Sequence, residues 1–414
     1  MRLLLSCYAC EPNRGSEPGI GWNWALGMAR RHETTVLVNP IHREAIERWL
    51  AENALPPEQT PKFVFVETAG FIFRRLGVNT LSLKLHYPLW QWKARSVVNA
   101  MSPRPDVIHH LTWSAFTLPG FWWKRKEKVV LGPLGGFSLV PFPFLRLFPP
   151  LKRVAELARH FLRKAWMNPF FLIARRNADA MIFTTNETMR KYSGNGIAFA
   201  SLDFAVPQLM FSVDRDVPPI KERFFAWAGV LEPRKGLEIA LRAFAKAFPN
   251  TTDRPRFLIM GNGWEMERHK RLALKLGIAN SVEFYGNLPQ NELWQNIRKS
   301  TALVFSSVRD TCGCVNIEAL ALQTPVICFN HQGVGDLTDD SCAIRIPPSG
   351  WDESIGAFAE AMKKLDSDST LAARMGAAGR KRMQEHFSFE QKFDAFDKIY
   401  ADITAKTGDL HGTR

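Results

Sequence analysis

The sequence predicts an α/β protein with two domains, each a parallel β-sheet covered by helices on both faces. A chain of 414 residues exceeds one ordinary hydrophobic core, so two domains of roughly 200 residues each are expected. Short apolar runs alternate with helical patterns along the chain, which is typical of parallel sheets. The alternation breaks in the proline-containing stretch 206–222, which indicates a linker.

Domain 1 is expected over 1–205 and domain 2 over 223–388. In domain 1 the first strand is followed by a helix from about Ile20 to Arg31. The predicted strands of domain 1 are Leu3–Ser6, Thr34–Asn39, Lys62–Glu67, Asp106–His110, Lys128–Leu131, Met181–Thr184 and Ile197–Ala200. Those of domain 2 are Phe224–Gly229, Arg256–Met260, Ser281–Tyr285, Ala302–Phe305 and Val326–Phe329.

Composition limits the compartment and the partners. No apolar run approaches the ~18 residues that span a bilayer, and the apolar part of the N-terminus is too short for a signal peptide, so we expect a cytoplasmic protein. Six cysteines form no disulfide framework, and the isolated Cys7-x-x-Cys10 is a weak zinc signal. The net charge of +14 indicates an anionic partner: nucleic acid, acidic lipid or a phosphorylated substrate.

The most informative motif is a pair of acids in a strand–loop–helix–strand unit. Asp310 follows the predicted strand Ala302–Phe305, and Glu318 lies eight positions later on the predicted helix. The amides of Gly313, Cys314 and Val315 would form the N-terminus of this helix, where unpaired N–H groups suit a diphosphate. Two acids at this spacing alone would more often be a surface aspartate and a capping glutamate, but their place in the unit favours a binding site.

Two glycine-containing loops follow predicted strands. The loop Gly229–Gly236 opens a helix and carries Arg234 and Lys235. After the first strand, Gly19 and Gly21 precede the predicted helix, and such a turn lets backbone approach a phosphate closely. A purely structural turn at Gly19 and Gly21 is the alternative.

Together these motifs resemble the donor site of retaining glycosyltransferases of family 4, which have the GT-B fold: two Rossmann-like domains facing across a cleft. The resemblance implies that Asp310 holds hydroxyls of the donated sugar and Glu318 the ribose. It also implies that Lys235 neutralises the diphosphate and that Gly19 and Gly21 face it. The segment 389–414 would cross back onto domain 1.

The chain departs from this family at three positions. Val230 stands where the family has a phosphate-binding arginine, and Arg234 could substitute for it. Asp310 replaces the usual glutamate. Leu111 replaces the sugar-contacting histidine, for which His109 or His110 is the candidate substitute; a histidine at a strand end can also be merely hydrogen-bonded.

Basic residues are concentrated in 137–176. Between Phe137 and Asn177 eight basic residues accompany Glu156 alone, and apolar residues recur at helical spacing from Leu151 to Ala165. With the aromatic loop that contains Phe142, Phe144 and Phe148, this pattern predicts docking on an anionic membrane. A core-packed helix with a solvated basic face is the alternative, and no nucleic-acid-binding motif accompanies the charge.

The resemblance implies a retaining transfer of a sugar from a nucleotide sugar to a glycan or lipid-linked acceptor in polysaccharide or exopolysaccharide synthesis. The protein would lie on the inner face of the cytoplasmic membrane and need no cofactor and no metal. The Asp214-x-Asp216 pair has the form of a metal motif but lies in the predicted linker. Two alternatives stay open: a catalytically weakened binding or assembly partner, and a sugar-nucleotide epimerase of similar fold.

Overall fold

The computed structural model describes residues 1–14, 16–68, 70–162, 168–194, 196–206, 210, 221–249 and 252–405. Most of the predicted linker 206–222, including Asp214 and Asp216, lies outside these residues. The chain divides into two compact units. Unit 1 comprises the described parts of Met1–Phe137, Arg163–Phe204 and Phe389–Arg414, and unit 2 those of Ser138–Leu162 and Ala205–Ser388.

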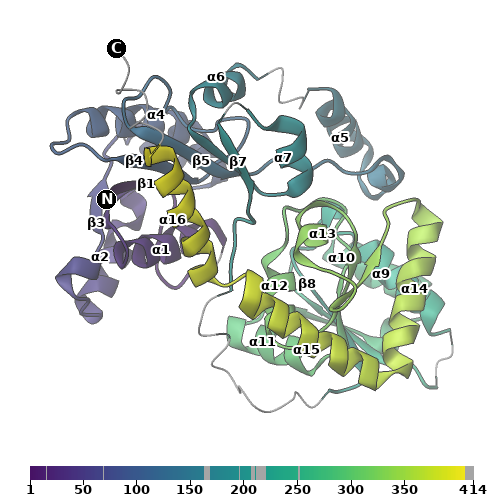
Figure 1. Cartoon of the computed structure of the whole chain (residues 1–414). Helices are drawn as coiled ribbons and strands as arrows, with labels where there is room; N and C mark the ends of the chain where they lie inside the picture. Colours follow the sequence, from purple (N-terminus) through teal and green to yellow (C-terminus); the bar gives the residue numbers. More distant parts are fainter. Residues whose placement is uncertain are drawn as a thin grey trace. The chain divides into compact units, whose positions relative to one another are not determined.

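Unit 1 contains a parallel sheet in the order β3-β2-β1-β4-β5-β6-β7 (Figure 1). Its strands are β1 Arg2–Cys7, β2 Glu33–Val38, β3 Lys62–Phe65, β4 Val107–Thr112, β5 Lys128–Leu134, β6 Ala180–Phe183 and β7 Ile197–Ala200. Its α-helices are α1 Ser16–Ala29, α2 Arg43–Glu52, α3 Phe71–Leu76, α4 Thr80–Asn99, α6 Pro169–Asn177, α7 Asn186–Tyr192 and α16 Phe389–Ala405. Short 3-10 helices are η1 Pro40–His42 and η2 Pro57–Gln59.

The last helix, α16, packs on α1 through aromatic and charged contacts. The rings of Phe393 and Phe396 meet the edge of Trp24, and Gly27 lies so close to Phe393 that a side chain would not fit. At the end of α1, Arg31 forms ion pairs with three acids of α16, which are Glu390, Asp394 and Asp397. The described part of the predicted segment 389–414 therefore packs in the core of unit 1, and 406–414 lie outside the described residues.

Unit 2 contains a second parallel sheet, in the order β10-β9-β8-β11-β12-β13. Its strands are β8 Phe224–Ala228, β9 Arg256–Met260, β10 Val282–Gly286, β11 Ala302–Phe305, β12 Val326–Phe329 and β13 Ala343–Ile346. Its α-helices are α5 Pro150–Leu162, α9 Leu237–Ala247, α10 Met266–Lys275, α11 Gln290–Lys299, α12 Cys314–Ala321, α13 Gln332–Leu337, α14 Trp351–Ser367 and α15 Ser369–His386. Its 3-10 helices are η3 Phe142–Leu147, η5 Pro233–Lys235 and η6 Ala279–Ser281.

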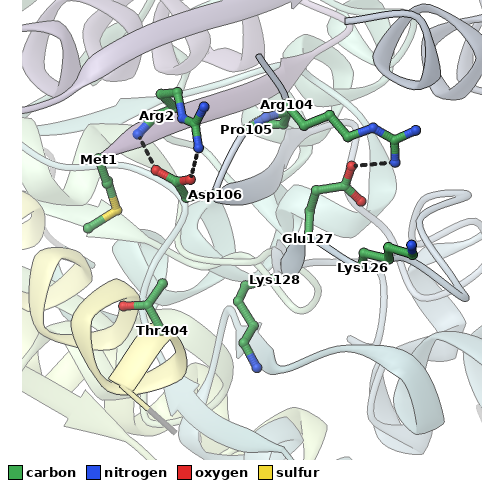
Figure 2. A pocket seen from close by; sticks show the side chains of 9 residues that line it. All are labelled: Met1, Arg2, Arg104, Pro105, Asp106, Lys126, Glu127, Lys128 and Thr404. Carbon is green, nitrogen blue, oxygen red and sulfur yellow. Dashed lines mark hydrogen bonds and ion pairs between the residues drawn. The ribbon is translucent and has the colours of Figure 1, made fainter. Parts of the chain in front are cut away.

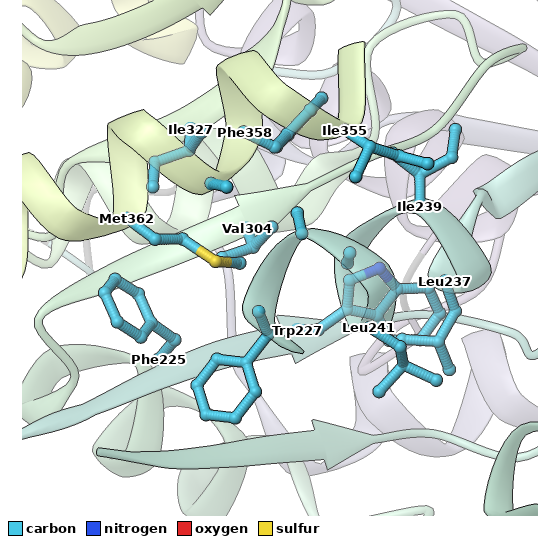
Figure 3. Packing of buried hydrophobic residues seen from close by; sticks show 14 of the residues in the cluster. Phe225, Trp227, Leu237, Ile239, Leu241, Val304, Ile327, Ile355, Phe358 and Met362 are labelled. Carbon is cyan, nitrogen blue, oxygen red and sulfur yellow. The ribbon is translucent and has the colours of Figure 1, made fainter. Parts of the chain in front are cut away.

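The core of unit 2 lies between β8, β11 and β12 and the helices α9 and α14 (Figure 3). Trp227 and Phe225 on β8 pack with Leu241 on α9, while Phe358 and Met362 reach the sheet from α14. Continuous burial along β8, β11 and β12 is the pattern expected of parallel strands that are covered on both faces.

Every predicted strand is present, and the structure adds β13, which the sequence analysis missed. Two boundaries change the reading of the site. Helix α1 begins at Ser16 rather than near Ile20, and β4 continues to Thr112 instead of ending at His110.

The segment 137–176 is divided between the two units, and residues 163–167 within it lie outside the described residues. Its docking on a membrane stays a prediction. The aromatic loop predicted to be exposed is largely buried: Phe144 and Phe148 belong to the core of unit 2, and only Phe142 stays outside. Helix α5 keeps Leu151 and Val154 exposed. The assignment of 138–162 to domain 1 was wrong for the same reason, since its buried side chains pack against unit 2.

Candidate functional site

In unit 2 the loops that follow β8 and β11 meet at the point where the strand order reverses. Strands β9 and β10 lie on one side of β8, and β11, β12 and β13 lie on the other. Open parallel sheets bind ligands at the carboxyl ends of the two strands that flank such a point. The loop Gly229–Gly236 and the loop 306–313 occupy this position.

Close backbone contacts hold the loop Gly229–Gly236 in place. Gly236 has a φ of 67°, and a Cβ on it would lie 2.1 Å from the carbonyl oxygen of Ser306. Gly261, which follows β9, lies against Gly229, where a Cβ would be 1.9 Å from the carbonyl oxygen. Only glycine fits at both positions, so the neighbouring loops fix the path of the chain that carries Arg234 and Lys235.

Charged side chains from the two loops meet at Asp310. Lys235 Nζ forms an ion pair with Asp310 Oδ2, and Arg234 Nη1 lies 3.7 Å from the same oxygen. Arg234 also pairs with Glu232 at 2.5 Å and donates to the carbonyl of Arg309 at 3.3 Å. The structure therefore brings the predicted site residues Arg234, Lys235 and Asp310 together.

The loop around Asp310 is held by residues that the sequence analysis did not single out. The Asp310 N–H donates to Gln332 Oε1 at 2.8 Å, and the Gln332 amide donates in turn to the carbonyl of Leu139 at 3.0 Å. Asp310 Oδ1 accepts from the Thr311 N–H at 2.9 Å. Gln332 is the first residue of α13, the helix after β12, and no local pattern marks a residue that supports a site from there.

Helix α12 begins directly after this loop, with Gly313 as its N-cap at a φ of 75°. Cys314 and Val315 are its first helical residues, so their amides are among the unpaired donors of the N-terminal turn. Asn316 donates to the carbonyl of Cys312 at 2.7 Å, which steadies the turn. The N-terminus of α12 thus follows Asp310 in the chain, and the two cations of the other loop approach Asp310, which suits an anionic group.

Glu318 lies one turn further along α12 and is buried. Burial raises the pKa of its carboxyl group, because the charged form loses hydration, and the neighbouring Trp294 and Gln290 side chains partly offset this effect. Both neighbours belong to α11. The ribose-binding role of Glu318 stays a prediction.

Val230 occupies the position where the resembled family has an arginine, and its side chain is 52% exposed. An exposed valine has no charge to offer a phosphate. The cations of this loop in the structure are Arg234 and Lys235.

Gly19 and Gly21 lie inside helix α1 and not in a turn before it. A Cβ on Gly19 would lie 2.0 Å from the carbonyl oxygen of Arg14, and one on Gly21 would lie 2.3 Å from that of Ala9. The two glycines allow α1 to approach the loop that follows β1. The prediction that these glycines precede the helix was wrong, and their role in donor binding stays a prediction.

His109 and His110 do not overhang a cleft at the end of a strand, because β4 extends beyond them and both side chains are fully buried. His109 pairs with the Tyr400 hydroxyl at 2.6 Å and the Gly132 carbonyl at 2.7 Å. His110 pairs with the Tyr87 hydroxyl at 2.8 Å and with Ser6 Oγ at 2.9 Å. Burial lowers the pKa of His109 to about 4 and that of His110 to about 3. Their geometry gives the predicted catalytic role no support.

Glu17 is the residue of unit 1 that sequence analysis overlooked. It stands in the first turn of α1, and its Oε2 accepts the backbone N–H of Trp113, which follows β4, at 3.1 Å. Strands β1 and β4 flank the reversal point of this sheet, so Glu17 joins the two loops there. Burial, with a smaller contribution from Asp203, raises the pKa of Glu17 to about 7.

A cavity of about 540 Å³ lies at the opposite, amino-terminal edge of the sheet of unit 1 (Figure 2). Arg2 and Asp106 pair across it at 2.6 Å, and Arg104 lies 3.4 Å from Glu127. These residues begin or precede β1, β4 and β5, so the cavity is remote from the loops that follow those strands.

Among the described residues, no group of three or more His, Cys, Asp or Glu side chains is arranged to hold a metal ion. Within the same residues, no helix combines the length and the apolar character needed to cross a bilayer.

Comparison with known proteins found similarity to glycosyltransferases. Residues 212–382 match the family model described as "Glycosyl transferases group 1". A D-inositol 3-phosphate glycosyltransferase of Corynebacterium jeikeium is 26% identical over 195 residues, which are 45% of each chain. The chain thus spans less than half the length of this relative.

Two solved structures resemble the whole chain. Sucrose-phosphate synthase from Thermosynechococcus elongatus has a TM-score of 0.61 at 15% identity and covers 99% of this chain and 98% of its own. HepE of Anabaena, solved with UDP, has a TM-score of 0.57 at 12% identity, with the same coverage. These likenesses show that the chain has the GT-B fold.

Proposed function

We propose that this protein is a retaining glycosyltransferase that moves a sugar from a nucleotide sugar to an acceptor hydroxyl. The observation that carries the proposal is the convergence of Lys235, Arg234 and Asp310 with the N-terminus of α12 at the reversal point of unit 2. The group 1 model matches this part of the chain, and a glycosyltransferase is similar to the chain over 195 residues.

In this proposal the two cations and the amides of Cys314 and Val315 bind the donor diphosphate and stabilise the charge that develops on it as it leaves. Asp310 contacts hydroxyls of the donated sugar, and Glu318 contacts the ribose. The leaving phosphate takes the proton of the acceptor hydroxyl as the new glycosidic bond forms on the same face, so no separate carboxylate base and no metal is required.

Lys235 has a second role in this scheme. Its ion pair with Asp310 keeps both side chains aimed at one point. A bound diphosphate would take over some of the hydrogen bonds that the Lys235 ammonium group donates. Asp310 would then accept hydrogen bonds from the sugar hydroxyls. A charge-assisted pair can be shared in this way because lysine has three donors.

The acceptor that we propose is a lipid-linked or membrane-proximal glycan in polysaccharide synthesis, with the protein on the inner face of the cytoplasmic membrane. The excess of 54 basic over 40 acidic residues supports an anionic surface as a partner.

A second candidate is a binding or assembly protein that has lost most of its activity. The exposed Val230, where a phosphate-binding arginine would be expected, favours it. One experiment separates the two: nucleotide release from a panel of nucleotide sugars, measured with and without membrane extracts as acceptor. Acceptor-dependent release supports the transferase, whereas binding of a donor without any release supports the second candidate.

A further inference from the structure

Helices α3 and α4 of unit 1 present a row of large apolar side chains to solvent. On α4, Leu81, Leu85, Leu89 and Trp92 are between 46% and 63% exposed. At 3.6 residues per turn they lie within about 80° of one another around the helix. Phe71, which begins α3, is 54% exposed, and α3 contacts α4. Exposed apolar side chains are therefore present on both of these contacting helices.

This row is not the core-facing side of the helix. The other face of α4 is already packed in the core of unit 1, where His86, Tyr87, Trp90, Ala94 and Val98 are buried. A surface helix of a globular protein normally turns polar residues to solvent on its outer side. An additional exposed apolar row on such a helix marks an interaction surface.

The charges around the row are of one sign. Between Glu67 and Asp106 the chain has six basic residues and no acidic one. Lys84 and Lys93 border the apolar row of α4 on its two sides, and Arg74 and Arg75 are exposed on α3. Within the described residues these four cations form no ion pair.

We propose that α3 and α4 form the surface by which this protein docks on an anionic lipid bilayer. Apolar side chains with an aromatic ring suit the boundary between headgroups and acyl chains, and flanking lysines and arginines suit anionic headgroups. A second copy of the chain is a poor occupant, because its own cations would face these. This inference rests on the proposed function in one respect, which is that the acceptor lies at a membrane. It does not depend on how the donor is bound.

The test is sedimentation of the full chain with vesicles, using two variants of matched size. One variant carries Leu85→Ser, Leu89→Ser and Trp92→Ser on α4, and the control carries Leu151→Ser, Val154→Ser and Phe161→Ser, the exposed apolar residues of α5. Vesicles rich in phosphatidylglycerol are compared with pure phosphatidylcholine. We expect the wild type to bind the anionic vesicles, the α4 variant about tenfold less and the α5 control as the wild type does.

A charge variant, Lys84→Glu with Lys93→Glu, should lose binding to anionic vesicles and should make the residual binding insensitive to salt. Circular dichroism and donor-dependent thermal shift show that each variant is folded. The proposal is overturned if the wild type does not bind anionic vesicles, if the α5 control loses binding while the α4 variant keeps it, or if the α4 substitutions only dissolve a dimer seen by light scattering. A wild type that binds anionic vesicles but releases no nucleotide from any nucleotide sugar would count against the proposed function and not against the docking surface.

Discussion

The reversal points of the two sheets have the same strand order but opposite chemistry. In unit 2, Lys235, Arg234 and Asp310 are charged and partly open to solvent at this place. In unit 1 the corresponding strands carry His109 and His110, which are buried and hydrogen-bonded, and the carboxyl of Glu17, whose pKa burial raises to about 7. The same topology thus carries partly exposed charged side chains in unit 2 and buried histidines in unit 1.

Removing the cation that defines the unit 2 site should have the largest effect. We expect Lys235→Ala to lower kcat/KM by about 100-fold, because a charge on the leaving diphosphate loses its main partner. Steady-state nucleotide release measures this. Lys275→Ala, an exposed lysine of the same unit, is the control, and equal activity of the two variants would contradict the assignment of the clamp.

The next test concerns the buried acid of unit 2. We expect Glu318→Gln to weaken donor binding by about 1.5–3 kcal/mol, since a charged acceptor of hydroxyl hydrogen bonds is lost while the volume is kept. Calorimetric titration with the donor measures the change. Glu292→Gln on the exposed side of α11 should bind normally. Unchanged affinity in a folded Glu318 variant would remove Glu318 from the site.

The pH dependence of stability tests whether Glu17 of unit 1 is buried. Glu17 holds its proton up to a pKa of about 7, whereas the unfolded chain releases it near pH 4–5, so the stability of the wild type should fall as pH rises between these values. Glu17→Gln keeps an acceptor for the Trp113 N–H and should remove this fall, making the variant more stable by about 1–2 kcal/mol at pH 8. Urea unfolding at pH 4 and pH 8 measures the difference, and parallel pH dependence would contradict the burial of Glu17.

The smallest effect is expected for Arg234. This residue is already engaged by Glu232 and by the Arg309 carbonyl, so we expect Arg234→Ala to lower turnover about three- to tenfold, less than the lysine substitution. The exposed Arg271→Ala is its matched control in the same assay. If Arg234→Ala equals this control, Val230 marks a truncated clamp, and the binding-protein candidate gains.

The local sequence was sufficient to predict the strands and the loops that follow them, which depend on periodicity and spacing. It was not sufficient to predict which side chains are buried. The predicted strands are present, and the loops that carry Lys235 and Asp310 share a sheet edge because each follows a strand beside the reversal point. The position of the two histidines was predicted wrongly because β4 continues for two residues beyond His110. Their hydroxyl partners could not be predicted locally, since residues such as Tyr400 are distant in sequence.

The prediction that the aromatic loop before α5 is exposed was wrong for a related reason. Basic and apolar residues alternate on α5 and on α4 alike, but a helical pattern does not say which apolar residues a core will cover. The loop before α5 buries Phe144 in unit 2, whereas α4 buries Trp90 and leaves Trp92 outside. Only the packed structure distinguishes the two faces.

The packing of α16 in unit 1 and of 138–162 in unit 2 has a consequence for hybrids between this chain and a relative. A hybrid that exchanged only 223–388 with a relative would leave behind Phe144, whose ring meets that of Phe329 in the exchanged part. A hybrid that also took the tail would separate Tyr400 from His109. Unit 2 can therefore be exchanged with its core contacts intact only by moving 138–162 together with 205–388 and keeping the native tail, so a simple crossover at the linker yields a mismatched core.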